Sequence, residues 1–321
     1  MSKETIIITG ASGEIGQNLI KSFISNENIN LIALDLQESE NKIKGCNYIT
    51  GNILDNQLVS DLHNNYSISS IYHLAAMLSS KAELNPQIAF EVNVKGTINF
   101  MELALAQNKK NKKVTKFFFP SSIAVYNTIN NNIKEPISEY MYCNPLTVYG
   151  QHKLYCENIG VAFDIYGNEL KDKIDFRCIR FPGILSSNTL PSGGTSDYLP
   201  EMINAAIHGK NYDCFVNQTT VLPFIVMPDA ISAIIKIMGT PKNNLSQHYY
   251  NVTSFSPSID NVYHKLLHVN PEFKLSYDID KKRQKIVNGW PQCVNDQKSR
   301  DDWGWSPKYN FEQALNNYLM T

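Results

Sequence analysis

Tyr149 and Lys153 are the residues of this 321-residue sequence whose types and spacing best suit acid–base chemistry. They lie four positions apart in a stretch with a helical pattern, so both side chains are expected on one face of a helix. A phenol has a pKa near ~10 in water, and a neighbouring ammonium favours the phenolate and lowers that pKa. Tyr149 could therefore act as a general base near neutral pH and remove the proton of a substrate hydroxyl.

Ser122 is the third residue with a predicted catalytic role. It follows the apolar run 115–120, which predicts a buried strand, and ligands of such folds bind at the carboxyl ends of the strands. Its hydroxyl could hold the substrate oxygen beside Tyr149. Ser121 is adjacent and stays an alternative for the same role.

A glycine-rich turn, GASGEIG at 10–16, separates the apolar run 5–9 from a helical pattern that begins near Glu14. Gly10 would allow the tight turn, Gly13 the approach of the backbone to a pyrophosphate, and Gly16 the close packing of helix and strand. The amino terminus of the helix would face the phosphate charge. The turn therefore predicts a dinucleotide site.

Asp35 suggests which dinucleotide binds. It lies 19 residues after Gly16 and follows the second apolar run, 29–34. A carboxylate at this place accepts hydrogen bonds from the adenosine ribose hydroxyls and repels a 2′-phosphate. The predicted cofactor is therefore NAD, in preference to NADP. Its positive nicotinamide ring, together with the Lys153 ammonium, is expected to favour the Tyr149 phenolate.

The elements that must position these residues follow from the apolar pattern. Apolar, nearly continuous runs predict strands that are buried on both faces, which is typical of a parallel sheet covered by helices. They lie at 5–9, 29–34, 70–75, 115–120 and 175–180, and helical patterns alternate with them at 14–25, 55–66, 87–108 and 148–167. The predicted fold class is α/β, a doubly wound, Rossmann-like parallel sheet.

The pattern changes after Pro182. A loop at 186–196 precedes a helix at 197–208, and the last 65 residues resemble a small helical lobe. The other predicted elements are short strands at 212–216 and 220–226, a helix at 229–239 and a strand at 249–253. We therefore predict a nucleotide-binding domain of residues 1–182 and 221–253, and a substrate lobe of residues 183–220 and 254–321.

Composition narrows the function classes. The net charge is −1, and no basic run exists that would attract nucleic acid or a membrane surface. No apolar run approaches the ~20 residues that span a bilayer. The six cysteines are scattered, which predicts reduced thiols, and no His/Cys/Asp cluster has zinc spacing, so we expect no metal. The first strand begins at Thr5, so we expect no leader peptide and a cytoplasmic protein.

Five segments stand in the order found in extended short-chain dehydrogenases/reductases, and the sequence resembles that family. They are LAAMLS (74–79), EVNVKGT (91–97), PSSIAVY (120–126), YGQHK (149–153) and RFPGI (180–184). The resemblance implies that Lys153 binds the nicotinamide ribose and that Asn93 supports the cofactor site. The predicted cofactor-binding set is Gly10, Ser12, Gly13, Glu14, Ile15, Gly16, Asp35, Leu36, Asn52, Ile53, Leu74, Ala75, Ala76, Asn93, Lys153, Phe181, Pro182 and Ile184.

Four further segments resemble the short-chain type of L-threonine 3-dehydrogenases. They are AMLSSKAE (76–83), GGTSDY (193–198), VLPFIVMPDA (221–230) and the tail from Trp290 to Trp305. The resemblance implies oxidation of L-threonine by NAD to 2-amino-3-oxobutanoate, and a homodimer through the helices at 87–108 and 148–167. The implied substrate-binding residues are Ser79, Ser122, Tyr149, Gly193, Thr195 and Trp290.

Some residues keep two interpretations. Arg180 could clamp a substrate carboxylate, but a structural pairing with an acid is favoured, and His73 is expected to be a packed core histidine. Trp303 and Trp305 are expected in the core of the lobe. Tyr126 stands at the aromatic position of a segment that usually reads PSSIAVF in this family.

Two rival functions also remain open. A nucleotide-sugar epimerase or dehydratase would share the glycine turn and the Ser/Tyr/Lys set, but it commonly has a larger lobe and an RYFN-type segment where this chain has RFPGI. A non-catalytic redox sensor of the same fold would typically lose the Tyr/Lys pair, which is present in this sequence.

Overall fold

A parallel sheet of seven strands organises the larger part of the chain. The structure, a computed structural model, describes residues 3–39, 42–129, 133, 135–166, 173–187 and 194–319. The strand order is β10-β6-β5-β4-β1-β2-β3, with every neighbouring pair parallel. The strands are β1 (Glu4–Thr9), β2 (Ile29–Asp35), β3 (Cys46–Thr50), β4 (Ile68–His73), β5 (Lys116–Ser122), β6 (Asp175–Phe181) and β10 (Tyr249–Asn251).

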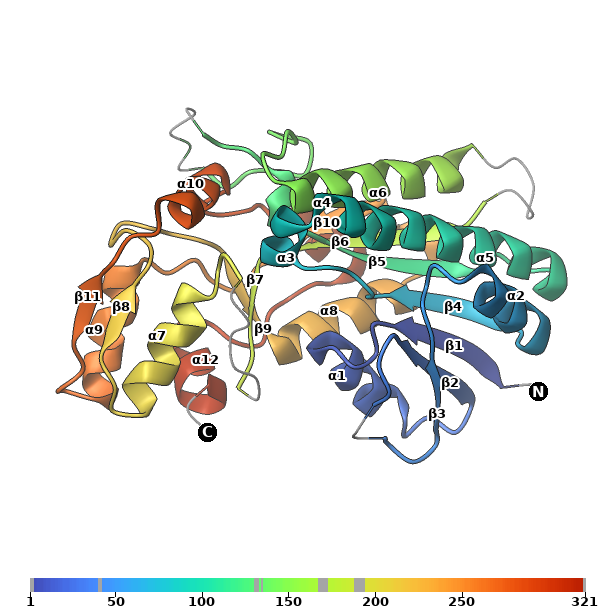
Figure 1. Cartoon of the computed structure of the whole chain (residues 1–321), viewed down its shortest axis with the longest axis horizontal. Coiled ribbons are helices and arrows are strands. Elements are labelled where there is room, and N and C mark those ends of the chain that lie inside the picture. Colours follow the sequence, from blue (N-terminus) through green and yellow to red (C-terminus); the bar gives the residue numbers. More distant parts are fainter. Residues whose placement is uncertain are drawn as a thin grey trace.

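Helices cover both faces of this sheet (Figure 1), which confirms the doubly wound α/β prediction. One face packs against α1 (Glu14–Phe23) and α8 (Met227–Gly239). The other packs against α2 (Asn56–Asn65), α5 (Gly96–Asn111) and α6 (Val148–Ile165). The chain reverses its direction of winding between β1 and β4, and ligands of such sheets bind outside the carboxyl ends of the strands at that point.

The predicted helix at 87–108 is made of three pieces. A short α4 (Pro86–Phe90) leads into a π-helical turn, η1 (Glu91–Lys95), and the chain continues as α5 to Asn111. Another short helix, α3 (Ser79–Leu84), precedes them, and a 3-10 turn, η2 (Ile123–Val125), follows β5. The π-helical turn contains Asn93, one of the predicted site residues.

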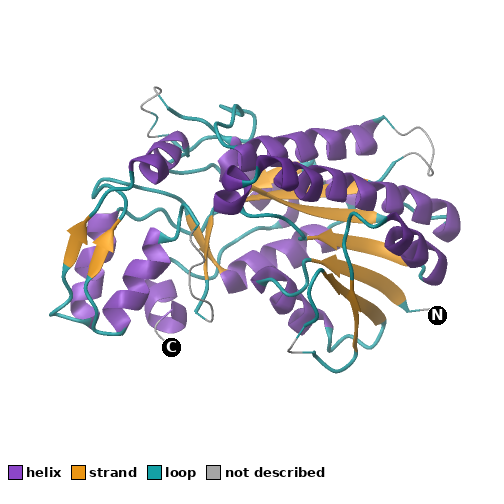
Figure 2. Ribbon diagram, viewed as in Figure 1, coloured by secondary structure: helices purple, strands orange, loops and turns teal. Residues whose placement is uncertain are grey.

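The smaller lobe lies beside the carboxyl ends of the sheet strands (Figure 2). Its helices are α7 (Tyr198–Ile207), α9 (Ile259–Val269), α10 (Lys281–Gly289), α12 (Phe311–Ala314) and the π-helical η5 (Leu315–Leu319). Two short parallel pairs complete it: β7 (Gly183–Leu185) with β9 (Phe224–Val226), and β8 (Tyr212–Cys214) with β11 (Leu275–Tyr277). The division into domains at the predicted boundaries stays a prediction.

The tail tryptophans lie in the core, but not in the core of the lobe. Helix α11 (Gln297–Trp303) lies against β10, and Trp303 and Trp305 belong to the hydrophobic cluster formed by β1, β2, α1 and α8. The Trp303 ring meets that of Tyr250 edge-on at 5.9 Å. The expectation of lobe-core tryptophans is therefore wrong, because their position late in the sequence says nothing about which sheet face they cover.

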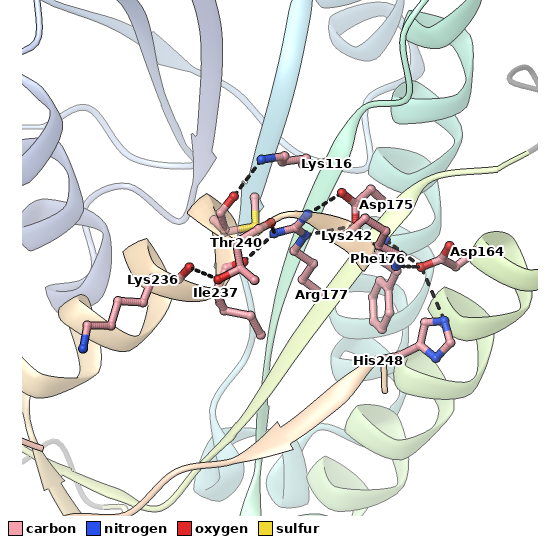
Figure 3. Close-up of polar contacts among 11 residues, drawn as sticks. Lys116, Asp164, Asp175, Phe176, Arg177, Lys236, Ile237, Thr240, Lys242 and His248 are labelled. Carbon is pink, nitrogen blue, oxygen red and sulfur yellow. Dashed lines mark hydrogen bonds and ion pairs between the residues drawn. The ribbon is translucent and has the colours of Figure 1, made fainter. Parts of the chain in front are cut away.

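An ion-pair cluster lies at the amino-terminal end of β6, away from the strands' carboxyl ends (Figure 3). Arg177 of β6 donates from Nε and Nη2 to Asp175 at 2.9 and 2.6 Å, and from Nη1 to the carbonyl oxygens of Ile237 and Thr240. These carbonyls end α8, where a cation is favoured by the helix dipole. Arg177 thus holds α8 on the sheet and has a structural role.

Candidate active site

The glycine turn after β1 has the geometry that the sequence predicts. Gly10 has a φ of +64°, and a Cβ there would lie 2.7 Å from the backbone nitrogen of Ala75. At Gly16 a Cβ would lie 2.7 Å from the backbone of Ala11. Both positions therefore require glycine, and α1 begins at Glu14 directly after the turn. The helix amino terminus faces the carboxyl edge of the sheet, where an anion can bind.

Ser12 and Asp35 show that this turn fits a dinucleotide. The backbone nitrogen of Ser12 donates to Asp35 Oδ2 at 2.8 Å, so the carboxylate at the end of β2 lies beside the turn. Ser12 Oγ is buried and has no hydrogen-bond partner among the described residues. A buried hydroxyl without a partner is costly unless a ligand satisfies it. A phosphate oxygen would do so, and the carboxylate suits the ribose hydroxyls.

Hydrogen bonds link the carboxyl ends of the neighbouring parallel strands β1 and β4. The Ala75 backbone amide donates to Thr9 Oγ1 at 3.2 Å, and the Thr9 hydroxyl is hydrogen-bonded to His73 Nδ1, 3.0 Å away. Burial lowers the pKa of His73 to about 3. His73 is thus neutral and packed between Phe100 and Phe117, as expected for a core histidine.

Asn93 supports the next stretch of backbone. Its Oδ1 accepts from the Met77 amide at 2.7 Å, and its Nδ2 donates to the Met77 carbonyl at 3.0 Å. Asn93 is buried in η1 and reaches the segment between β4 and α3. This segment carries Ala76 and leads to Ser79, so one side chain fixes a predicted cofactor contact and a predicted substrate contact together.

Tyr149, Lys153 and Ser122 meet where β5 ends beside the first turns of α6. Lys153 Nζ donates to the Pro120 carbonyl at 2.6 Å and lies 5.5 Å from the centre of the Tyr149 ring. Ser122 ends β5, and its Oγ accepts from the Ala124 amide at 3.1 Å. The neighbouring Ser121 points to the other side of the strand, where its Oγ is buried and has no hydrogen-bond partner among the described residues. Ser122 is thus the better placed serine.

Burial determines the ionisation of the pair in the protein without cofactor. Burial raises the pKa of the Tyr149 phenol well above its usual value. Burial also lowers the pKa of Lys153 to about 8, against the weaker opposing effects of Cys156, Cys178 and Glu157. Desolvation therefore outweighs the attraction of the ammonium in the protein alone. A second positive charge near the phenol would favour the phenolate further.

Glu83 is a site residue that sequence reasoning missed. Its Oε1 accepts from the Tyr149 backbone nitrogen at 3.1 Å, and Thr147 Oγ1 accepts from the Gly150 amide at 3.0 Å. Both satisfy free donors in the first turn of α6. Thr147 could have been predicted as a helix cap from its place before the helical pattern, but Glu83 is distant in sequence and gave no signal.

The other predicted cofactor residues differ in their exposure. Phe181, Pro182 and Ile53 are buried, Leu74 and Ile184 are half-buried, and Asn52 and Leu36 are exposed. Among the predicted substrate residues, Ser79 is half-buried at the start of α3, while Thr195 and Trp290 are buried. Gly193 lies outside the described residues. The binding roles of all these residues stay predictions.

Comparison with known proteins decides the family. A sequence profile described as the NAD dependent epimerase/dehydratase family matches residues 6–253. The chain belongs to this family. Membership implies an enzyme that uses a nicotinamide dinucleotide, and the glycine turn and the Tyr149/Lys153 pair lie inside the matched range.

Similar proteins extend the likeness beyond the profile. An uncharacterized epimerase/dehydratase of Staphylococcus aureus is 32% identical, over 95% of this chain and 92% of its own. The mitochondrial L-threonine 3-dehydrogenase of Bos taurus is 28% identical, over 99% of this chain and 82% of its own. The solved structure of a monomeric L-threonine 3-dehydrogenase from a metagenome matches with a TM-score of 0.86 and 35% identity, covering 98% of this chain and 97% of its own. The predicted resemblance is confirmed.

The described part of the molecule lacks two kinds of feature. No helix there is both long and apolar enough to cross a membrane. No group of three or more His, Cys, Asp or Glu side chains there could hold a metal ion.

Proposed function

We propose that this protein oxidises the 3-hydroxyl of L-threonine with NAD, giving 2-amino-3-oxobutanoate. The observation that carries the proposal is the likeness to L-threonine 3-dehydrogenases over nearly the whole chain, lobe and tail included. The lobe determines which substrate such a fold binds, whereas the Ser/Tyr/Lys set is shared among reactions.

The described residues support each step of this oxidation. Bound NAD would supply the hydride acceptor, held by the glycine turn, Asp35 and Lys153. Ser122 Oγ holds the substrate oxygen at the end of β5, and Tyr149 removes its proton. The positive charges of Lys153 and the oxidised nicotinamide offset the desolvation that raises the pKa of Tyr149. Proton removal thus depends on a charge that only the oxidised cofactor brings.

Short polar side chains suit the amino-acid head of threonine. We assign Ser79 and Thr195 to the carboxylate and ammonium groups, and Trp290 to closing the pocket. Arg180 is not available as a carboxylate clamp, because its guanidinium forks onto Glu157 at 2.8 and 2.5 Å. The predicted structural pairing of Arg180 with an acid is therefore confirmed.

The preference for NAD over NADP rests on Asp35. A 2′-phosphate would lie against this carboxylate, which already accepts from Ser12 at 2.8 Å. We expect kcat/KM to favour NAD by at least one to two orders of magnitude, roughly the cost of bringing two anions together. Initial rates with both cofactors measure this ratio, and Asp35→Ser should reduce it. Equal values of kcat/KM for NAD and NADP in the wild type would show that Asp35 does not select the cofactor at its adenosine ribose.

An absorbance assay for NADH tests the substrate. L-Threonine should give stable NADH, while L-serine should be poorer by roughly 10- to 200-fold because it lacks one methyl group. allo-Threonine should react poorly, since its hydroxyl would point away from Tyr149. Thr195→Val should raise the KM for threonine more than that for NAD.

Matched variants test the chemistry. Tyr149→Phe should lower turnover by roughly 100-fold or more while NAD binding stays nearly intact. Ser122→Ala should also lose most of its turnover, whereas Ser121→Ala should keep it, because successive side chains of a strand point to opposite faces and only Ser122 is expected to face the substrate. Near-normal turnover of the phenylalanine variant would mean that another group removes the proton.

The second candidate is a nucleotide-sugar 4-epimerase or dehydratase, favoured by the family profile and the name of the S. aureus relative. An epimerase recycles its NADH and binds a uridine nucleotide. Interconversion of a UDP-sugar at its 4-position, with no NADH from threonine, would replace the first proposal with this one.

We also propose a homodimer through α5 and α6, in the cytoplasm. Apolar side chains on and before these helices are open to solvent: Ile88 (56% exposed), Phe90 (42%) and Tyr155 (48%). A second copy would cover them through a shared, self-complementary face. Sedimentation should give twice the monomer mass, and Tyr155→Glu should give the monomer. Cell fractionation tests the location.

A further inference from the structure

A buried ion pair begins one turn beyond the catalytic pair. Glu157 follows Lys153 by four residues, so Tyr149, Lys153 and Glu157 share one face of α6. Arg180 of β6 donates from Nε and Nη2 to the two oxygens of Glu157, at 2.8 and 2.5 Å. The two side chains are only 1% and 0% exposed. This fork fixes the rotation of α6 about its axis relative to the sheet.

The other side of the Arg180 guanidinium is held as tightly. Its Nη1 donates to Tyr126 Oη at 2.9 Å and to the Glu139 carbonyl. The guanidinium also lies over the rings of Tyr126 and Tyr249, 5.0 and 4.4 Å from their centres. Arg180 thus joins α6 to the turn after β5 and to the segment that leads into α6.

Tyr126 carries the network on to the tail. Its hydroxyl donates to Asn251 Oδ1 at 2.8 Å. Asn251 Nδ2 donates to the backbone carbonyls of Ile137 and Asn295 at 3.2 and 3.3 Å, and Ser299 Oγ donates to the Asn251 backbone carbonyl at 2.5 Å. The tail segment from Trp290 to Ser299 runs between the lobe and the sheet, so the network links the catalytic helix to the chain that closes the lobe.

We propose that the chain of contacts Glu157–Arg180–Tyr126–Asn251, here called the positioning network, places Lys153 and Tyr149 against the end of β5. The same contacts fix this placement relative to the tail segment from Trp290 to Ser299. These residues are positioning residues, because they act through α6 and the tail and not on the substrate. The inference deepens the proposed function and rests on it for the reaction. A phenylalanine at position 126 could not make the Tyr126 link.

One member of the network, Glu157, also contributes to the electrostatic surroundings of Lys153. The titratable groups that interact with Lys153 are Tyr149, Cys156 and Glu157 of α6, His73 of β4 and Cys178 of β6. Glu157 is the carboxylate of this set and favours the protonated ammonium, which burial disfavours. Loss of the Glu157 charge should lower the pKa of Lys153 further, while loss of the Arg180 fork alone should not.

Three variants of the full-length protein separate geometry from charge. Tyr126→Phe and Arg180→Lys should each lower kcat roughly 10-fold, the scale of a small misplacement of reacting groups, with little change in the KM for NAD. Tyr72→Phe is the matched control, since its ring is buried on the other face of the sheet against Phe23 and Phe118. Glu157→Gln should move the alkaline limb of the kcat–pH profile to lower pH, and Arg180→Lys should leave that limb in place.

Two results would overturn the inference. One is an unchanged kcat in Tyr126→Phe and Arg180→Lys once thermal unfolding has given the folded fraction. The other is superimposable pH profiles of the wild type and Glu157→Gln. The titration of Lys153, followed by NMR of lysine labelled at Cε, needs no substrate. A lower Lys153 pKa in Glu157→Gln together with no threonine oxidation by the wild type would keep the network and reject the proposed function.

Discussion

Replacing Lys153 with methionine should make the cofactor-free protein more stable near neutral pH. Burial lowers the pKa of Lys153 from its usual 10.5 to about 8, so the fold must hold an ammonium that it disfavours. At 1.36 kcal/mol per pH unit, this fall corresponds to about 3 kcal/mol. The variant also loses the hydrogen bond to the Pro120 carbonyl, which costs about 1 kcal/mol. The expected gain at pH 7 is therefore about 2 kcal/mol.

The sign of the pH dependence follows from proton binding. Between pH 8 and 10.5 Lys153 is neutral in the folded wild type and protonated in the unfolded chain, so the unfolded state binds more protons. The free energy of unfolding of the wild type, relative to the variant, then rises with pH across this window. The advantage of Lys153→Met should thus shrink above pH 8 and be gone by about pH 10.

Urea unfolding of both proteins at several pH values, at one protein concentration, measures the difference. Lys95→Met is the control, because Lys95 forms an exposed pair with Glu91 and should give a small difference at every pH. A Lys153→Met protein that is less stable at pH 7, by the same margin at pH 10, would show that Lys153 is not disfavoured by burial.

Two further changes test the walls of the cofactor site. Gly10→Ala places a Cβ 2.7 Å from the Ala75 nitrogen at a φ of +64°, and a left-handed residue other than glycine costs about 1–2 kcal/mol. NADH fluorescence titration should therefore show affinity reduced by roughly 10-fold or more. Unchanged affinity would mean that the turn can move. Asn93→Leu removes two buried hydrogen bonds to Met77, worth about 1 kcal/mol each. Thermal unfolding should show the lower stability, and the KM for threonine should rise. A KM at the wild-type value would show that Asn93 does not position the substrate-binding segment.

The sequence predicted those parts of the fold that depend on continuous burial. The run at 5–9 is rich in isoleucine because both faces of β1 are covered, so the strand can be recognised from its sequence alone. Strand β6 is buried along its whole length as well, but its charged residues Asp175, Arg177 and Arg180 are held in ion pairs or hydrogen bonds. Strand β3 was missed. Its residues Cys46–Thr50 lie at the edge of the sheet, and each is half-buried or exposed, so polar side chains are tolerated there. An edge strand of this kind lacks the apolar run on which the prediction depends.

The site was predictable where chemistry is local in sequence. The glycine turn and the four-residue spacing of Tyr149 and Lys153 have direct physical meaning. The direction of the Tyr149 pKa was not predictable, because it depends on how many atoms bury the phenol and not on which residue lies one turn away. Glu83 escaped notice for a similar reason, since its contact with Tyr149 joins positions 66 residues apart.

The place of Trp303 and Trp305 in the core has a consequence for synthesis on the ribosome. The face of the sheet under α5 and α6 can be completed once β6 has emerged at Phe181. The opposite face cannot, because Ile6 and Ile8 of β1 share one hydrophobic cluster with Trp305, almost the whole length of the chain away. Contacts so distant in sequence form late. Until then the apolar surface of α8 and β10 is exposed to solvent. A nascent chain that ends near residue 253 therefore has one covered sheet face and one exposed apolar face, which can bind chaperones or aggregate.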